Sequence, residues 1–134
     1  MLGQVQQFPT GGTTITLSTT AAVTKDIRYD GSYKFGDVWL VVEARTATAA
    51  TVTITIVGLF PDAVTKVLTV PTNATALACG APDQSTPHLF VVDISKLYSD
   101  SGTKDNCMSP FGYQVSLTGT GADADICDVS IWAG

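Results

Sequence analysis

The sequence predicts an all-β protein: a two-sheet antiparallel β-sandwich of about eight strands, jelly-roll-like, with an Ig-like sandwich as the alternative. Charged residues make up only 14% of the 134 residues, against about 25% in a typical soluble domain, and 20 threonines take much of their place. The acidic residues are eleven Asp and a single Glu, which disfavours helices, because Asp prefers turns and caps. Alternation of apolar and polar residues dominates the chain, and no long segment shows helical spacing.

Most of the expected strands come from this alternation. The clearest is residues 51–57, where Val52, Ile54 and Ile56 share one face and threonines occupy the other. Residues 38–45 begin apolar on both faces, which is typical of a central strand. In chain order, the expected strands are residues 13–17, 22–29, 38–45, 51–57, 64–70, 89–94, 111–118 and 125–132.

The connections support a sandwich. Residues 46–50 are short enough to join their flanking strands in a hairpin, and residues 119–124 predict a terminal hairpin. The longer irregular stretches 72–87 and 95–109 suit strands that cross between two sheets, so a closed barrel is less favoured. A single helical turn is expected within residues 94–98.

We divide the chain into an N-terminal arm, residues 1–12, and one β-sandwich domain, residues 13–134. The arm carries no charge, and Pro9 with Gly11 and Gly12 separates it from the first expected strand. It is interpreted as a frayed terminus, or alternatively as an arm that docks on a neighbouring subunit.

Charge and hydropathy exclude several classes of partner. The net charge is −5 and the pI about 4.4, and the seven Lys and Arg form no basic run, so we expect no nucleic-acid partner and no anionic membrane partner. No apolar stretch approaches the roughly 20 residues of a membrane span, and the N-terminus does not resemble a secretory signal. We therefore expect the chain to stay in the compartment where it is made.

Catalytic and metal chemistry finds little support. The single histidine, His88, begins an apolar strand and is interpreted as a structural strand-end residue, so no enzyme and no catalytic residue is predicted. Cys79, Cys107 and Cys127 are too widely spaced for a zinc site. Cys127 is expected to be a buried filler, and Cys79 and Cys107 are left as reduced thiols, with a bridge between them as the alternative.

The densest acidic cluster is Asp123, Asp125 and Asp128. It lacks the spacing of an EF-hand, so we interpret it as an acidic turn, with a calcium site as the alternative. No metal or other cofactor is predicted.

Aromatic residues offer one candidate contact surface. Tyr29, Tyr33 and Phe35 lie together in a loop rich in Gly, Asp and Lys, and Phe8 of the arm is added to them as a candidate contact. These rings either close the end of the sandwich or form a contact surface for a protein or a glycan.

Two parts of the sequence resemble a known family. The first part is residues 37–43 (DVWLVVE) followed by 51–56 (TVTITI), and the second is residues 113–119 (YQVSLTG) followed by 129–132 (VSIW). Both are similar to small β-sandwich virion proteins of tailed bacteriophages, most like capsid decoration, or cement, proteins. The resemblance implies a β-sandwich without an active site, forming a homo-oligomer, often a trimer, on the outer capsid. There it would clamp neighbouring copies of the major capsid protein. The resemblance transfers no individual residues.

The resulting hypothesis is a structural virion protein, made in the host cytoplasm and located on the capsid surface, with a tail or fibre component as the alternative. Few charges and many Thr hydroxyls make surfaces that are easily desolvated between subunits, and edge strands with few lysines fit an assembling protein. The competing class is a lectin-like carbohydrate-binding module. Its sites would be Tyr33 and the Asp123, Asp125 and Asp128 cluster.

Overall fold

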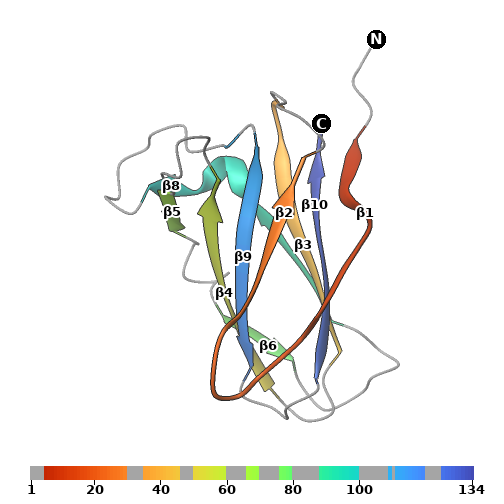
Figure 1. The fold of residues 1–134 in the computed structure, drawn as a ribbon, viewed down its shortest axis with the longest axis vertical. Coiled ribbons are helices and arrows are strands. Elements are labelled where there is room, and N and C mark those ends of the chain that lie inside the picture. The colour runs from red at the N-terminus through yellow and green to blue at the C-terminus, as the bar shows by residue number, and fades with distance from the viewer. Residues whose placement is uncertain are drawn as a thin grey trace.

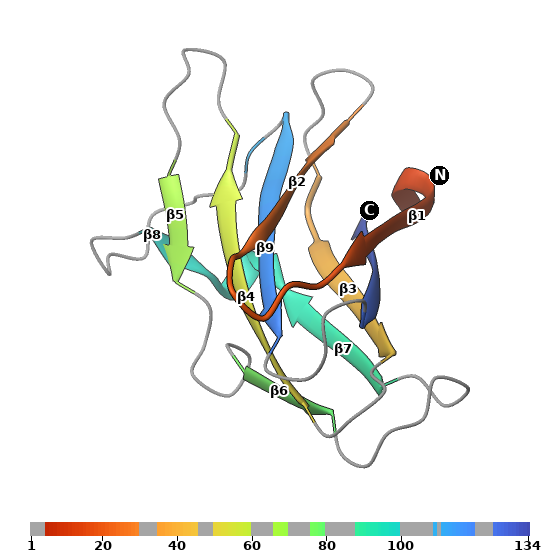
Figure 2. The same ribbon diagram turned by 60° about the horizontal axis from the view of Figure 1, so that its bottom comes forward.

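The computed structural model describes residues 5–29, 35–45, 50–59, 66–69, 76–79, 88–99, 109, 111–119 and 125–134. These residues form two β-sheets packed face to face, as Figures 1 and 2 show. In chain order the strands are β1 (Gln6–Thr16), β2 (Val23–Arg28), β3 (Val38–Arg45), β4 (Ala50–Gly58), β5 (Lys66–Thr69), β6 (Ala76–Cys79), β7 (His88–Asp93), β8 (Tyr98–Ser99), β9 (Gly112–Gly119) and β10 (Ile126–Ala133).

The strand order identifies a jelly roll. The four-stranded sheet has the order β1-β10-β3-β7, and the larger sheet has the order β2-β9-β4-β5-β8, with β6 also paired to β4. The antiparallel pairs β1–β10, β2–β9, β3–β7 and β4–β5 are nested in the sequence, which is the pairing of a jelly roll of eight strands. The predicted jelly-roll sandwich is therefore confirmed. The short strands β6 and β8 are additions, and both lie in stretches that we expected to be irregular.

Both predicted hairpins are wrong. β3 belongs to the four-stranded sheet and β4 to the larger one, so residues 46–49 connect the two sheets. The same holds for β9 and β10, which pair with different neighbours. A short connection and two alternating strands are compatible with either arrangement. What decides between them is that each strand must bury its apolar face on the shared core between the sheets.

The first strand also differs from the prediction, because it begins at Gln6 rather than at Thr13. Residues 6–12, which we expected in an N-terminal arm, thus lie in β1 and are part of the sheet that β10 holds together. The alternation is interrupted here by Pro9, Gly11 and Gly12, and the Phe8–Pro9 peptide bond is cis. The structure accommodates these residues in a register shift between Phe8 and Thr13.

The core fills the space between the two inner faces. Every second residue of β3 is buried, and β9 shows the same period, as expected for strands with one face on a core. The largest fully buried side chains are Tyr113, Ile15, Ile27, Leu40, Ile56, Ile94, Leu117 and Ile131. Burial of one such aliphatic side chain contributes roughly 1.5–3 kcal/mol to folding.

Helical structure in the described part of the chain is limited to the 3₁₀ helix Ile94–Lys96, within the expected helical turn. The side chain of Asp93 caps it by accepting a hydrogen bond of 3.0 Å from the backbone N–H of Ser95. Among the described residues there is no helix of the length and hydropathy needed to cross a membrane.

Two glycines with positive φ, Gly112 of β9 and Gly11 of β1, allow a test of how closely β9 packs against β2. Gly112 has φ +128°, and a Cβ there would overlap the carbonyl oxygen of Ile27 and lie 2.8 Å from Cα of Arg28. Gly11 also has a positive φ, +82°, but a Cβ there would meet nothing within 4 Å. We expect Gly112→Ala to lower the free energy of unfolding by more than about 3 kcal/mol, because the clash adds to the backbone strain.

Gly11→Ala adds the backbone strain of a positive φ without a clash, and should lower the free energy of unfolding by only about 1 kcal/mol. Urea unfolding followed by circular dichroism measures both values. Equal losses in the two variants would show that β2 and β9 are not packed as described.

Candidate functional site

The outer face of the four-stranded sheet is built by the side chains that alternate away from the core. On β3 the residues facing outward are Trp39, Val41, Glu43 and Arg45, because their neighbours in the sequence are buried. On β10 the same parity sends Ile126, Asp128, Ser130 and Trp132 to this face. These eight positions lie on the two central strands, each of which has a neighbouring strand on both sides.

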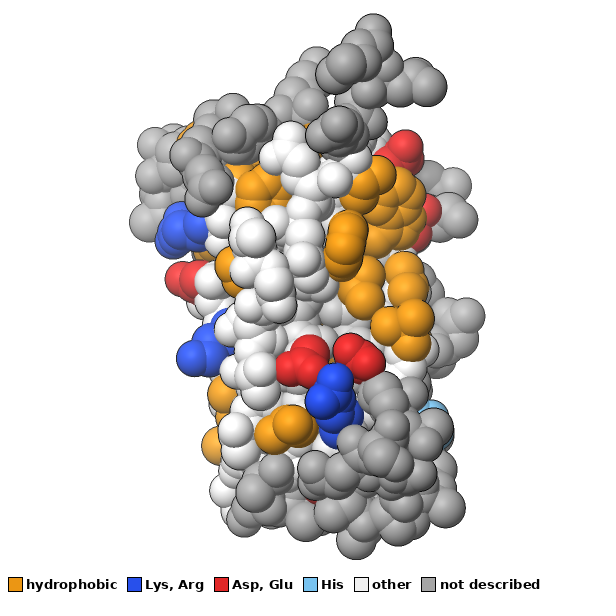
Figure 3. Space-filling model, turned by 90° about the vertical axis from the view of Figure 1, so that its right-hand side faces the viewer, with side chains coloured by type: hydrophobic (Ala, Val, Ile, Leu, Met, Phe, Trp, Pro, Cys, Tyr) orange, Lys and Arg blue, Asp and Glu red, His pale blue; other side chains and the backbone are white. Residues whose placement is uncertain are grey.

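The register sorts these side chains into rows. Trp132 lies opposite Trp39, and Asp128 lies opposite Glu43. The rows continue onto β7, where Val91 lies opposite Val41 and Leu89 opposite Glu43. The face therefore combines a largely apolar area, formed by Trp39, Val41, Val91 and Trp132, with a charged row, formed by Glu43, Arg45 and Asp128. Figure 3 shows hydrophobic side chains gathered on this side of the molecule, above a small group of acidic and basic side chains.

The apolar area reaches the edge of the sheet. β7 is the last strand in the order β1-β10-β3-β7. Its outward side chains, Leu89 and Val91, are 66% and 52% exposed. Apolar side chains of this size, adjacent on an edge strand, indicate a contact surface.

The charged row is held by one guanidinium group. Nη2 of Arg45 lies 3.2 Å from Oδ2 of Asp128 and 3.7 Å from Oε1 of Glu43. The hydroxyl of Thr14 on β1 donates to Oδ1 of Asp128 over 2.8 Å. Two carboxylates opposite one another on neighbouring strands repel, and Arg45 offsets this repulsion.

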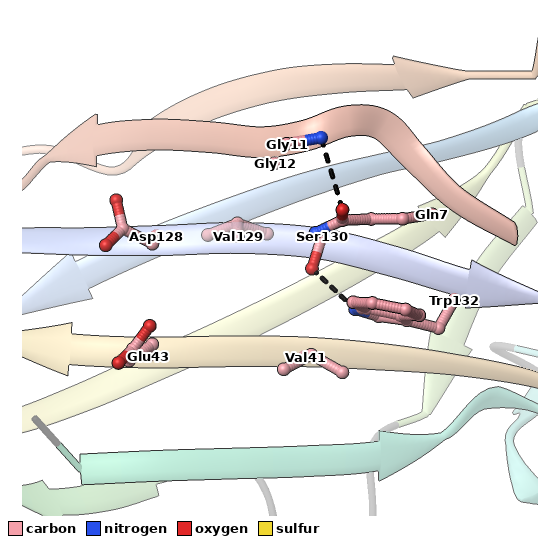
Figure 4. Close-up of a pocket in the computed structure, with 9 residues that line it drawn as sticks. All are labelled: Gln7, Gly11, Gly12, Val41, Glu43, Asp128, Val129, Ser130 and Trp132. Atoms are coloured by element: carbon pink, nitrogen blue, oxygen red, sulfur yellow. Dashed lines mark hydrogen bonds between the residues drawn. The ribbon is translucent and has the colours of Figure 1, made fainter.

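A pocket of about 320 Å³ opens on the same face, between β1, β10 and β3. Figure 4 labels its lining, which comprises three residues of β1, two of β3 and four of β10. Nε1 of Trp132 donates to Oγ of Ser130 over 2.9 Å, and Oε1 of Gln7 accepts from the backbone N–H of Gly11 over 3.1 Å. Both hydrogen bonds restrict side chains that line the pocket.

Of the two interpretations of the loop aromatics, closure of the end of the sandwich agrees with the structure for the described rings. Phe8 and Tyr29 are only 5% and 6% exposed. Their ring centroids are 4.8 Å apart, and the partly buried Phe35 packs 5.1 Å from Tyr29. Phe8 and Tyr29 pack edge-to-face on each other, and Tyr29 also packs on Tyr113, so that little of either ring is exposed to a partner. Tyr33 lies outside the described residues.

The predicted acidic cluster is divided. Asp125 is 1% exposed, whereas Asp128 lies on the outer face in its ion pair with Arg45. Asp123 lies outside the described residues, which contain no group of three side chains suited to hold a metal ion. The calcium alternative therefore has no support from Asp125 and Asp128, whose carboxylates belong to different environments.

His88 is the first residue of β7, opposite Ala44, which agrees with its interpretation as a strand-end residue. Cys127 is fully buried, as predicted. The side chain of Cys79 and all of Cys107 lie outside the part of the chain that the structure describes, so their reduced or bridged state stays a prediction.

Sequence reasoning missed the residues that form this face. The candidate contacts chosen from the sequence are the loop aromatics with Phe8, and they do not include Trp39 or Trp132. Residues 89–94 were predicted as an apolar strand, without a statement of which face Leu89 and Val91 occupy. The signal that was available is the parity of β3 and β10, since Glu43 and Asp128 mark the outward face of each strand.

Comparisons with known proteins add distant structural likenesses. No protein-family model matches the chain, and no curated protein matches it. Among solved structures, the VP2 subviral particle of infectious bursal disease virus is 14% identical with a TM-score of 0.41, covering 97% of this chain and 29% of that chain. A structure of the Gt strain of the same virus is 16% identical with a TM-score of 0.42, again covering 97% of this chain and 29% of that one. The chain thus spans less than a third of either protein, and its function is inferred from its own side chains.

The buried aromatic cluster predicts a dependence of stability on alkaline pH. Burial raises the pKa of Tyr29 well above its ordinary value, and the neighbouring Tyr113 adds to the shift. Above about pH 10 the unfolded chain releases this proton while the folded chain keeps it, so stability falls as the pH rises. For one such group, the free energy of unfolding falls by up to about 1.4 kcal/mol for each pH unit.

We expect Tyr29→Phe to flatten the decline of the unfolding free energy between about pH 9.5 and 11.5, relative to the unaltered protein. At pH 7 the same comparison serves as the control, because both side chains are then neutral. Parallel curves for the two proteins at high pH would show that Tyr29 titrates as it does in the unfolded chain.

Proposed function

We propose that this chain is a non-enzymatic structural protein of a virion, a decoration protein on the outer surface of a bacteriophage capsid. It would be made in the host cytoplasm and bind the major capsid protein without a cofactor. The observation that carries the proposal is the exposed apolar edge strand β7, continuous with the apolar area on β3 and β10.

The edge strands of the two sheets differ in how well they are protected against pairing with a strand of another chain. β1, at the opposite edge of the same sheet, contains Pro9 and a register shift, both of which discourage pairing with another strand. β2, at an edge of the larger sheet, carries Lys25, Asp26 and Arg28. β7 has the sequence HLFVVD, with no lysine, no proline and two exposed apolar side chains. An edge of this kind is suited to a partner strand.

The charges around this edge indicate what the partner offers. Glu43 lies beside Leu89, and Asp93 ends β7. The net charge of the whole chain is −5. A complementary surface would present an apolar strip and basic side chains at its rim, and we assign this surface to the major capsid protein.

Architecture and sequence agree with a capsid role. The nested strand pairs form a jelly roll, a fold that serves in viral capsid domains as well as in lectins. A fold hosts many functions, so this agreement supports the proposal only together with the surface of β7. The resemblance of residues 37–43 and 113–119 to capsid decoration proteins points the same way, and implies a homo-oligomer, with a trimer favoured.

Addition of the purified chain to capsids that lack it tests the proposal. We expect saturable binding at hundreds of copies per particle and capsids that withstand a higher temperature. Leu89→Lys combined with Val91→Lys should weaken binding at least tenfold, because two ammonium groups would be desolvated against an apolar strip.

Thr53→Lys combined with Thr55→Lys is the matched control. It adds the same charges to exposed positions on β4 of the other sheet, and should bind as the unaltered chain does. Light scattering of the free protein measures the expected oligomer.

Each alternative outcome has a definite meaning. A strictly monomeric chain that leaves capsids unaltered would refute the decoration role. Binding at a few copies per particle would favour a tail or fibre component. Equal binding by both double variants would exclude β7 as the contact.

A further inference from the structure

We propose that the pocket between β1, β10 and β3 is a binding site for a neutral saccharide. It lies on the outer face of the four-stranded sheet, at the strand edge opposite β7. The inference does not depend on the capsid role, because it rests on the shape of the pocket, one aromatic wall and a mixed set of polar groups.

The shape of the pocket comes from the irregular part of β1. Between the pairs Phe8–Ile131 and Thr13–Val129, residues 9–12 on β1 stand opposite the single residue Ser130 on β10. Gly12 adopts φ +77°, and a Cβ there would lie 3.7 Å from Nε2 of Gln7 and 3.8 Å from Cβ of Ser130. A side chain at Gly12 would therefore project between these two groups, and glycine keeps the space open.

Trp132 supplies an aromatic wall. In Figure 4 its indole ring is seen edge-on and so stands up from the sheet beside Ser130, whose hydroxyl holds the ring by accepting from Nε1 over 2.9 Å. The negative face of an aromatic ring attracts C–H groups that neighbouring oxygens have made electropositive. A pyranose ring offers a patch of such C–H groups on one face, at a size that suits a pocket of about 320 Å³.

The polar groups favour a neutral ligand. Asp128 and Glu43 are acceptors that line the pocket, and Arg45 beside them is a donor. Oε1 of Gln7 accepts from the N–H of Gly11, which turns the amide so that Nε2, a donor, lies 3.7 Å from where a Cβ of Gly12 would be. Arg45, outside the lining, pairs with both carboxylates and so reduces their attraction for a cation, whereas an anion would meet the two carboxylates directly. A hydroxyl, which donates and accepts, matches both kinds of group.

The test uses the full-length chain and an array of neutral and acidic glycans, followed by ligand-observed NMR titration of the strongest neutral glycan. We expect a dissociation constant in the millimolar to high-micromolar range, as befits one open pocket. Trp132→Ala should weaken binding at least tenfold. Asp128→Asn, which keeps the size of the side chain, should weaken it several-fold.

Trp39→Ala is the matched control. It removes the same side chain from the position directly opposite Trp132, outside the pocket lining, and should leave saccharide affinity unchanged. Circular dichroism of all variants separates lost binding from lost folding. The double variant with Leu89→Lys and Val91→Lys, designed to abolish capsid binding, should still bind the saccharide. The two proposals can therefore fail independently of each other.

Three outcomes would overturn the proposal. The first is that no neutral glycan binds at millimolar concentration. The second is binding that Trp132→Ala leaves unaltered, which would place the site elsewhere. The third is preference for acidic glycans over neutral ones, which would mean that Arg45 rather than the combined donors and acceptors selects the ligand.

Discussion

The pairing of β10 with β1 on one side and β3 on the other is the constraint on which the rest of the structure depends. Cys127, Val129 and Ile131 of β10 are buried in the core, while Asp128 and Trp132, at the alternate positions, face outward. A slip of one residue in either pairing would exchange the two sets, burying a carboxylate and exposing the core. The hydrophobic core therefore fixes the outer surface as well, including the ion pair with Arg45 and the wall of the pocket.

The two edges of this sheet are used differently. β1 contains the register shift between Phe8 and Thr13, which disrupts the ladder at the edge and leaves the hollow that Gly12 keeps open. β7 has a regular register with β3 throughout, so its other edge, which no described strand pairs with, is continuous and carries Leu89 and Val91. The irregular edge is suited to a small ligand, because it is concave. The regular edge is suited to another protein chain, because its backbone N–H and C=O groups follow one strand without a bulge.

Strands could be predicted from the sequence where one face is buried in the core and the other is exposed to solvent. β3 was predicted at its observed bounds, and β4, β9 and β10 within one residue at each end, because their apolar residues recur at period two. The partners of these strands could not be predicted, since alternation does not say which sheet a strand joins. The start of β1 was missed because Pro9 and Gly11 break the alternation. The outer face was missed because Trp132 and Leu89 look equally apolar whether they face the core or the solvent.

Glu43 lies on the border between the two proposed surfaces, and its charge limits how they can be covered. It stands opposite Asp128 on β10 and opposite Leu89 on β7. A protein docked on β7 would remove water from Glu43, and a carboxylate desolvated without a partner is strongly destabilising. Arg45, two residues from Glu43 on β3, lies 3.7 Å from Glu43 and 3.2 Å from Asp128 and stays available as that partner. The shared guanidinium thus lets Leu89 be buried by a partner while the pocket beside Trp132 stays open.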